Sequence, residues 1–471
     1  MNLETFLLMR NELMLLAVIL MLVVGEIFIQ NKKALIPWAT ILFAIHTVIG
    51  FFPLQAGELF GGMFHSSLLI NMFKNVLNIG VLIILLQSTQ WLEKEVMPQH
   101  KSTEFFILLF SSLLGMYFMI SAGDFLMFYL GLELSALPVA ALVAFETTKR
   151  ESAEAGIKFI LLATLASGTS IFGISLIYAT TGSIYFSELA ELLTYTNLSL
   201  LGFVFFFSGL AFKISLVPYH FWTADVYQGA PIGITSYLSV ISKGSAVLIL
   251  MIILFTVMKP FAEVIDKLLY VIAVATMFMG NLFALRQQNM KRFLAFSSIA
   301  QAGFILLGIL SNDQLGVSAV IYFVSIYVFT NLAAFGVVQS ISSQTGKENM
   351  DDYNGLYRTN PKLSLIMMLA LFSLAGIPPV AGFFGKFFLF TAAASQGLYL
   401  LVFIAVVNVT ISLYYYLLVI RAMFLRRSEQ AVPYFENKLP MKIGLALAVI
   451  GVLFIGLYSP IHDYIYELSI F

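Results

Sequence analysis

Lysines lie inside stretches of this chain that are apolar enough to enter a lipid bilayer. Lys213 is inside one apolar run, with Pro218 five positions later, and Lys243 lies deep in the next run. An ammonium group at bilayer depth costs at least ~2.5–3.5 kcal/mol on insertion scales, so such a residue indicates function by default. Pro218 has no N–H and leaves carbonyls near Ile214 to be satisfied by water or by a neighbouring helix. A broken helix beside a buried charge predicts a hydrated ion path.

The charged residues inside predicted membrane segments are mostly basic. They are Lys74, Glu133, Lys158, Lys213, Lys243 and Lys386. Glu133 is the only acid near the middle of a predicted helix, whereas Glu26, Asp124 and Glu154 lie near helix ends. Five lysines and one central glutamate cannot form a set of neutral pairs, so we expect internal water or temporary loss of protons. For Lys213 alone, a structural alternative stays open, in which Pro218 kinks the helix and the lysine pairs with a carboxylate.

The magnitudes favour a switch between charge states. Full burial disfavours the charged form of a lysine by up to roughly 4–7 kcal/mol. A carboxylate about 4 Å away returns about 4 kcal/mol at an effective dielectric constant of about 20. Movement of Glu133 towards or away from a buried lysine would therefore change that lysine's charge. Proton transfer along a series of lysines needs this change.

Other polar residues near these lysines have two interpretations each. Asn71, Lys74, Asn75 and Asn78 form one stripe at helical spacing, and hydrogen bonding between helices is the preferred interpretation. His220, near the predicted inner end of its helix, either relays protons from the inside surface or is structural. Further candidates are polar side chains that hold water or pack against neighbouring helices, namely Ser297, Ser298 and Gln301. We expect the tyrosines at 414–416 to pack between helices.

The composition requires a hydrocarbon solvent. Sixty per cent of the residues are hydrophobic and 11% are charged, with a mean hydropathy of +0.95. Cysteine is absent, which excludes disulfides, thiolate metal sites and iron–sulfur ligands in this chain. The five histidines are too scattered for a local metal or haem motif. The N-terminus has acids and no small-residue cleavage site, so the first apolar run is expected to stay as a membrane helix.

Apolar runs of about 20 residues divide the chain into fourteen predicted spans. They lie at roughly 11–30, 35–54, 67–88, 104–122, 125–145, 155–179, 199–223, 231–256, 265–284, 292–310, 315–341, 363–393, 398–425 and 441–459. Most Lys and Arg residues fall in the connections from odd to even spans, whereas the other connections and the termini carry only Arg10, Lys259 and Lys267. The positive-inside rule therefore places both termini outside.

The chain also contains an imperfect internal repeat. The seventh span breaks at Pro218, and the twelfth breaks at residues 375–379, which include Pro378 and Pro379. A repeat of five helices must cross the membrane in opposite directions, as in the inverted repeats of transporters. We therefore predict an all-α polytopic membrane protein with two inverted five-helix repeats, each with a discontinuous helix. The expected parts are residues 1–103, 104–256 (first repeat), 265–425 (second repeat) and 426–471.

Four long motifs resemble the antiporter-like, proton-translocating membrane subunits of respiratory complex I. They are FKISLVPYHFWTADVYQGAP (212–231), NMKRFLAFSSIAQAGF (289–304), DDYNGLYRTNP (351–361) and LAGIPPVAGFFGKFFLF (374–390). The segments YLGLELSALPVAAL (129–142) and NVTISLYYYLLVIRAMF (408–424) look most like the subunit N branch, and less like the subunit M and L branches. The resemblance covers about residues 105–425. Before that, the chain is similar to the family only in hydropathy.

The resemblance implies a role for each charged residue. Glu133 would be coupled to Lys213, Lys158 would lie between this chain and its neighbour, Lys243 would be the central relay and Lys386 the exit-side lysine. Relatives often carry histidine where this chain has Gln301, and a glutamine cannot titrate.

The resemblance also implies a setting. The chain would be a subunit of a proton-pumping NADH:quinone oxidoreductase in the bacterial inner (plasma) membrane, between other membrane-arm subunits and within the lipid bilayer. We expect no nucleic acid partner. No cofactor or metal is expected in this chain, and flavin, iron–sulfur clusters and quinone would belong to partner subunits.

Two alternatives stay open. One is a subunit of a multisubunit sodium/proton exchanger, which resembles the same helix bundle. The other is a non-pumping scaffold of the membrane arm, although a scaffold has no reason to bear the insertion cost of five buried lysines.

Overall fold

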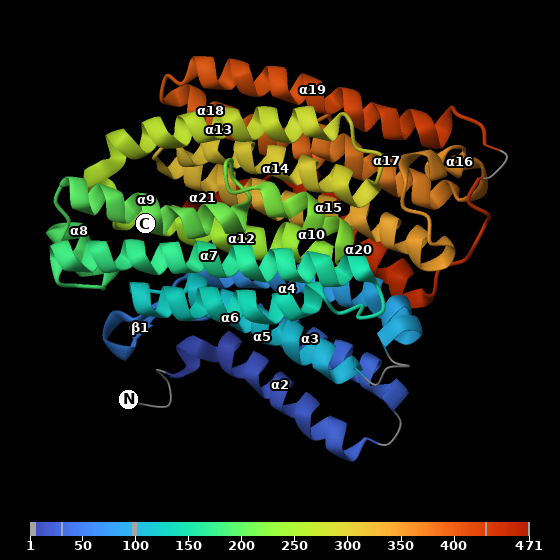
Figure 1. The fold of residues 1–471 in the computed structure, drawn as a ribbon, viewed down its shortest axis with the longest axis horizontal. Helices are drawn as coiled ribbons and strands as arrows, with labels where there is room; N and C mark the ends of the chain where they lie inside the picture. Colours follow the sequence, from blue (N-terminus) through green and yellow to red (C-terminus); the bar gives the residue numbers. More distant parts are fainter. Residues whose placement is uncertain (1–5, 30–31, 97–100, 429–430, 470–471) are drawn as a thin grey trace.

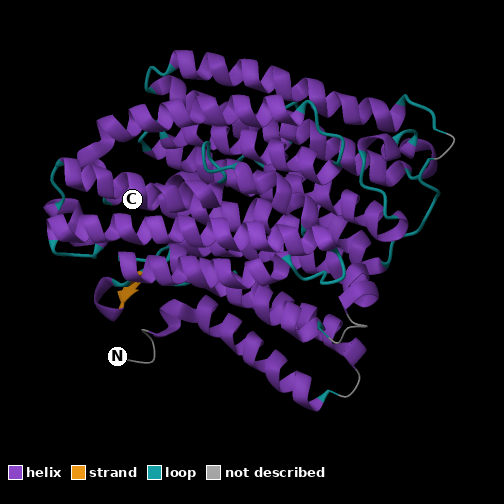
Figure 2. Cartoon of the chain, viewed as in Figure 1, coloured by secondary structure: helices purple, strands orange, loops and turns teal. Residues whose placement is uncertain are grey.

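The computed structural model describes residues 6–29, 32–96, 101–428 and 431–469, and nearly all of them are helical (Figure 2). Most of the long helices run along the long axis of the molecule (Figure 1). The short strands β1 (Gly57–Leu59) and β2 (Phe64–Ser66) form an antiparallel hairpin, which lies with helix α8 at one end of the bundle. Helix α16 lies at the opposite end. Within the described ranges, this hairpin is the only sheet.

The N-terminal part and the first repeat contain the following helices. They are α2 (Arg10–Phe28), α3 (Leu35–Gly50), α4 (Leu68–Trp91), α5 (Ser102–Ile120), α6 (Phe125–Val143), α7 (Arg150–Thr181), α8 (Phe186–Leu192), α9 (Asn197–Ile214), α10 (Phe221–Gly229), α11 (Ile232–Tyr237) and α12 (Lys243–Thr256). A π-helical turn, Leu238–Ser242, joins α11 to α12. These bounds match the predicted spans, except that the seventh span continues through α10 to Gly229.

The second repeat and the C-terminal part follow the same pattern. Their helices are α13 (Ala262–Ala284), α14 (Met290–Ile309), α15 (Gln314–Thr345), α16 (Leu356–Thr359), α17 (Pro361–Ala375), α18 (Ala381–Ser395), α19 (Tyr399–Phe424), α20 (Leu439–Leu457) and α21 (Pro460–Leu468). Twelve helices of the described chain qualify as membrane spans by length and composition. The shorter α3 and the broken pair α17/α18 account for the two further predicted spans.

The two repeats have matching parts that run in opposite directions. The helices α7 and α15 each have 32 residues and end at a left-handed glycine, Gly182 and Gly346. The caps before α6 and α14 each form an isolated β-bridge, from Asp124 to Tyr185 and from Asn289 to Asn349. After α7 and after α15, the next long helix is broken in its middle. This is the inverted-repeat architecture that the proline spacing predicts, and the division at residues 103, 256 and 425 stays a proposal.

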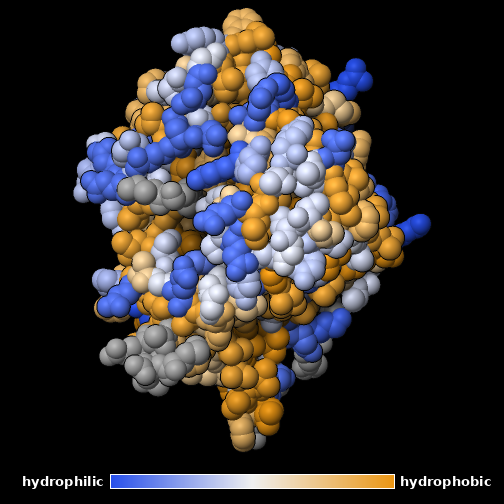
Figure 3. All heavy atoms as spheres, turned by 90° about the vertical axis from the view of Figure 1, so that its left-hand side faces the viewer, coloured by the Kyte–Doolittle hydropathy of each residue, from blue (hydrophilic) through white to orange (hydrophobic). Residues whose placement is uncertain are grey.

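One end of the molecule is more polar than its sides. Figure 3 looks at the end that carries β1 and α8, where hydrophilic side chains extend from the upper left across the middle, among hydrophobic ones. Along the sides, large apolar side chains point outwards, among them Leu165 on α7, Val271 on α13 and Phe403 on α19. By contrast, α12, α14 and α15 are buried almost throughout. Those three helices hold the core, against which the lysines are placed.

Candidate functional site

The break between α9 and α10 positions Lys213. Ser215 adopts a left-handed conformation that ends α9, and Pro218, exposed on the surface of the break, follows a cis peptide bond. The indole nitrogen of Trp222 donates a hydrogen bond to Phe212 O at 2.9 Å. This indole satisfies one of the carbonyls that the end of α9 leaves free. Because Trp222 bonds to this carbonyl, the ammonium group of Lys213 is not needed there and can contact another helix.

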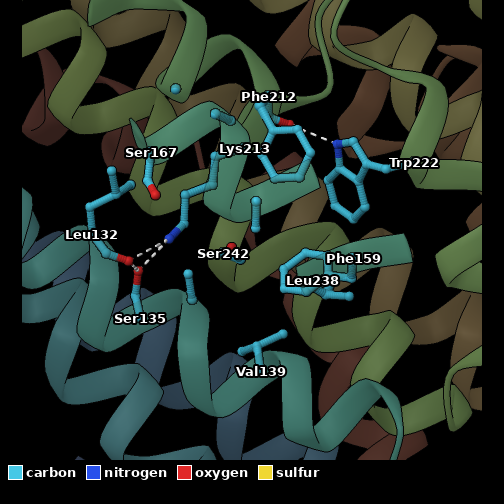
Figure 4. A pocket seen from close by; sticks show the side chains of 14 residues that line it. Leu132, Ser135, Val139, Phe159, Ser167, Phe212, Lys213, Trp222, Leu238 and Ser242 are labelled. Atoms are coloured by element: carbon cyan, nitrogen blue, oxygen red, sulfur yellow. Dashed lines mark hydrogen bonds between the residues drawn. The ribbon is translucent and has the colours of Figure 1, made fainter. Parts of the chain in front are cut away.

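Lys213 is directed towards α6. Its Nζ donates to Ser135 Oγ and lies 3.5 Å from Leu132 O (Figure 4). Glu133, on the same turn of α6, is half-buried and lies beside Tyr129. Among the ion pairs of the described residues, none joins Glu133 to Lys213 within 4 Å. The structural alternative, in which Lys213 is neutralised by a directly paired carboxylate, therefore does not describe this state.

A small cavity joins the surroundings of Lys213 to the π-helical turn before Lys243. It has a volume of about 30 Å³ and includes Ser135, Ser167 and Ser242 in its lining (Figure 4). A water molecule needs about 10–15 Å³ of such space and two to four polar partners. The cavity therefore has room for about two waters, with serine hydroxyls to bind them.

Lys243 lies at the centre of the bundle. Its side chain is buried, and its Nζ donates to Ser298 Oγ at 2.5 Å and to Ser298 O at 3.2 Å on α14. The hydroxyls of Tyr227 and Tyr327 are buried beside Ser298. Hydroxyls both donate and accept hydrogen bonds, so this group of side chains can bind water as well as the amine.

A row of polar groups on α14 leads from Lys243 to Lys386. The Ser297 hydroxyl lies 2.5 Å from the Tyr416 hydroxyl, one helical turn from Gln301. Gln301 Nε2 donates to Tyr416 Oη at 3.3 Å and to Leu374 O at 3.1 Å. The same Leu374 carbonyl accepts a hydrogen bond from Lys386. Gln301, which cannot titrate, thus links the Tyr416 hydroxyl to the second broken helix and lies three residues along α14 from Ser298, the partner of Lys243.

Lys386 closes the broken end of α17. Its Nζ donates to Leu374 O at 2.6 Å and to Ala375 O at 3.2 Å, and lies 4.8 Å from the centre of the Phe304 ring. A helix C-terminus carries a partial negative charge that favours a cation. The prolines at 378 and 379 lie in the exposed turn between α17 and α18, as the sequence predicts.

Lys158 differs from these three lysines. Its side chain is 41% exposed and forms ion pairs with Glu154 at 2.8 Å and with Asp225 at 2.7 Å. Asp225 also pairs with Arg292 at 2.6 Å, which connects α7, α10 and α14. Sequence reasoning missed Asp225, because α10 was not recognised as a helix. Its position seven residues after Pro218 was the available signal.

Lys74 forms a buried ion pair with Glu12 at 2.5 Å. The neighbouring Asn71 and Asn75 contact α2 and α3 by hydrogen bonds, so the interpretation of this stripe as contacts between helices is confirmed. The expectation that five lysines face one carboxylate is wrong, because Lys74 and Lys158 have acids of their own. Glu12 lies far from Lys74 in sequence and Asp225 lies in a helix that sequence reasoning missed, whereas Glu154 is one helical turn from Lys158.

His220 does not lie near the inner end of its helix. It is buried in the break between α9 and α10, and nine further helical residues follow it. Its ring lies 4.4 Å from that of Phe221. The described residues contain no cluster of three or more His, Asp or Glu side chains that could hold a metal ion.

A second cavity lies where the predicted inside connections meet. It measures about 110 Å³, and its lining includes Trp91, Glu146, Lys291, Gln339 and Glu348. Lys291 pairs with Glu348 at 3.1 Å. Polar and charged side chains line this cavity beside the start of α11, on the way to Lys243.

Comparison with known proteins agrees with this architecture. Residues 122–412 match the family described as NADH:quinone oxidoreductase/Mrp antiporter, TM. NADH-quinone oxidoreductase subunit N of Phocaeicola vulgatus is 49% identical over the full length of both chains. The subunit of the same name from Azobacteroides pseudotrichonymphae is 46% identical and covers 100% of this chain and 99% of its own.

Solved structures show the same fold. A chain of respiratory complex I from Thermus thermophilus is 26% identical, with a TM-score of 0.80 over 96% of this chain and 98% of its own. A chain of the Mrp complex from Dietzia has a TM-score of 0.85 over 100% of this chain and 97% of its own, at 20% identity, which shows the fold alone. The chain therefore belongs to the family of NADH:quinone oxidoreductase and Mrp antiporter membrane subunits.

Proposed function

We propose that this chain is a proton-translocating membrane subunit of an NADH:quinone oxidoreductase. The observation that carries the proposal is the connection of Lys213, Lys243 and Lys386 by hydroxyls, an amide and a cavity with room for water. All three amines are buried, and none faces the surface where lipid would lie. The full-length similarity to relatives named subunit N supports this choice of complex.

The proposed mechanism starts from the distance between Glu133 and Lys213. When Glu133 approaches, its charge stabilises the ammonium form of Lys213, and when it moves away, burial favours release of the proton. In the structure, the Lys213 amine contacts Ser135 Oγ and Leu132 O and no carboxylate. This is the geometry that we expect once Glu133 has moved away and Lys213 can release its proton. Lys243 then passes charge through water and the hydroxyls of α14 towards Lys386.

Lys158 belongs to the lysine series of this proposal, and Pro218 and the buried His220 support it at the break between α9 and α10. Lys158 lies on the outer face of α7, where a neighbouring membrane subunit would contact it, and Asp225 holds it there. Pro218 keeps the break open, which leaves the carbonyls of α9 to side chains and water. Uptake from the inside would use the polar cavity beside Lys291 and Glu348.

The proposal includes the setting of the subunit. Both termini would lie outside, in the periplasm, and other membrane subunits would pack on both sides of the chain. Flavin, iron–sulfur clusters and quinone would belong to partner subunits, since this chain has no cysteine to bind a cluster. An exchanger subunit is the second candidate, favoured by the fold match to the Mrp complex. Purification with partner chains separates the two, because flavin and iron–sulfur absorbance would accompany only the oxidoreductase.

The central test is Lys213→Ala in the assembled complex. We expect proton pumping in proteoliposomes to fall at least tenfold, because the switched amine is gone. The scheme is wrong if the assembled variant pumps protons as the unchanged complex does. Alanine at all four of Lys158, Lys213, Lys243 and Lys386 should spare pumping only if the chain is a scaffold.

A further inference from the structure

The N-terminal helices hold a buried ion pair that the lysine series does not use. Lys74 on α4 donates to Glu12 on α2, and the two side chains are 0% and 2% exposed. A buried ion pair adds little stability compared with apolar residues of the same volume, because desolvation of both charges offsets their attraction. Packing of α2 against α4 therefore does not require these charges.

Buried polar atoms without partners surround this pair. Within the described parts of the chain, Glu12 Oε2, His46 Nδ1, Asn75 Oδ1 and Asn78 Nδ2 lack a hydrogen-bond partner. An unpaired buried polar atom costs about 1–3 kcal/mol, so water is the expected partner of such a group. These atoms come from α2, α3 and α4. We call Glu12, His46, Lys74, Asn75 and Asn78 the N-terminal polar cluster.

Polar contacts lead from this cluster to one end of the molecule. Asn11, beside Glu12 in sequence, donates to Asn71 Oδ1 at 3.5 Å, and Asn71 donates to Ser66 Oγ at 3.0 Å. Ser66 ends strand β2. The preceding residue, His65, is partly exposed and lies 3.3 Å from Glu58 on β1. The hairpin thus brings a solvent-facing pair of titratable side chains close to the cluster.

A second set of contacts leads from the cluster to Lys213. Tyr117 Oη lies 3.2 Å from His46 Nε2 and donates to Asn78 Oδ1. The Tyr237 hydroxyl of α11 lies beside the same turn of α5, since it is 3.7 Å from Sδ of Met116, the residue before Tyr117. Tyr237 Oη donates in turn to Ser112 Oγ on α5 at 3.1 Å.

The last step crosses from α5 to α6. Ser112 Oγ donates to Ser135 O at 2.9 Å, and Ser135 Oγ accepts a hydrogen bond from Lys213. Side chains of α5 and α11 therefore reach Ser135, whose hydroxyl accepts from Lys213, and water has to bridge this last step because a peptide carbonyl does not pass a proton on. The route from Lys213 to the hairpin involves helices α2–α6 and α11, and none of α13–α21.

We propose that the N-terminal polar cluster is a proton-release route from Lys213 to the side of the membrane on which the β1–β2 hairpin lies. On this route, a proton that Lys213 does not hand on towards Lys243 leaves the ammonium group and passes through water and the Tyr237 and Tyr117 hydroxyls to the Glu12 carboxylate. Glu12 then loses one proton to water beside the hairpin, and one proton has left for each that Lys213 gave to this route. Lys74 stays charged and keeps Glu12 available as an acceptor, while the asparagine amides hold water without carrying protons.

This inference rests on the proposed function, and its test is designed to separate the two. The complex is purified with Glu12→Gln, reconstituted into vesicles, and assayed for proton movement driven by NADH oxidation. We expect proton movement to fall at least twofold, and Glu12→Asp to restore most of it, because aspartate can still accept a proton. Glu26→Gln is the matched control on the same helix. Glu26 accepts a hydrogen bond from Thr103 outside the route, and its variant should pump as the unchanged complex does.

Each outcome decides the proposal. If assembled Glu12→Gln pumps normally while Lys213→Ala does not, the release route is wrong and the proposed function stands. If Lys213→Ala also pumps normally, the proposed function itself is wrong. Where Glu12→Gln prevents assembly, Tyr237→Phe replaces it, since it removes one hydroxyl and keeps the ring. A twofold or larger loss of pumping then supports the route, and unchanged pumping overturns it.

Discussion

The two repeats have the same break in the backbone and place opposite charges after it. In each, a residue in the left-handed conformation, Ser215 or Gly376, ends the first half-helix three positions before a proline. Seven positions after that proline, the first repeat has Asp225 and the second has Lys386. The aspartate is partly exposed and paired with two cations, whereas the lysine is buried and, among the described residues, no acid forms an ion pair with it within 4 Å. The two repeats therefore share the shape of the broken helix but differ in the sign of the charge that follows it.

The difference changes what the lysines can do. In the first repeat, the neutral indole of Trp222 satisfies the Phe212 carbonyl, and Lys213 faces α6. In the second repeat, the ammonium group of Lys386 itself satisfies two carbonyls at the end of α17. Loss of a proton costs Lys386 a favourable contact with a helix C-terminus, which Lys213 does not have to the same degree. The two lysines therefore have different partners, a hydroxyl of α6 for Lys213 and the carbonyl end of α17 for Lys386.

The largest expected effect is that of Lys213→Arg. Arginine keeps the positive charge and does not lose its proton in proteins, so we expect at least a tenfold loss of proton pumping by the assembled complex. Lys158→Arg should retain most of the pumping, because Lys158 is partly exposed and acts through its ion pairs with two carboxylates. Proton movement in reconstituted vesicles measures both. Normal pumping by Lys213→Arg would show that residue 213 does not need to deprotonate.

Sequence reasoning found the elements that depend on local composition. Runs of about 20 apolar residues define the spans, and the prolines at 218 and at 378–379 mark both broken helices because proline cannot continue a helix. It failed where a short segment with an acid is helical through tertiary contacts. The segment FWTADVYQG of α10 is too short to be predicted as a helix of its own, and its Asp225 stays in the bundle because Lys158 and Arg292 neutralise it.

The sequence predicts which lysines of the candidate site are buried, but it does not predict which acids form ion pairs with the lysines. Burial of Lys213, Lys243 and Lys386 follows from their positions in long apolar runs. The partner of Lys74 does not follow in the same way, because Glu12 is 62 positions away and close to a helix start. Pairing over such a separation depends on how α2 packs against α4, which no local pattern in the sequence contains.

A stability comparison sharpens the difference between the two broken helices. Lys386→Met leaves Ala375 O unpaired, whereas Leu374 O keeps its hydrogen bond from Gln301, so we expect a loss of about 1–3 kcal/mol in the free energy of unfolding. Lys213→Met leaves Ser135 Oγ with its hydrogen bond to Leu132 O at 2.7 Å, so little loss follows. Thermal unfolding of the purified complex in detergent measures both variants. Equal losses would contradict the assignment of Lys386 as the group that closes α17.

The smallest expected effect is that of a change at Asp225, which holds the position in the first repeat that Lys386 holds in the second. Asp225→Asn leaves Lys158 and Arg292 without the carboxylate between them, although Lys158 keeps its pair with Glu154. Because these side chains are about one third exposed, we expect a loss of only about 0.2–1 kcal/mol in unfolding free energy. Salt screens partly exposed pairs, so the difference from the unchanged protein should shrink between low and high ionic strength. A loss that is large and independent of salt would mean that Asp225 is buried by a neighbouring subunit, and that the first repeat needs its acid as much as the second needs Lys386.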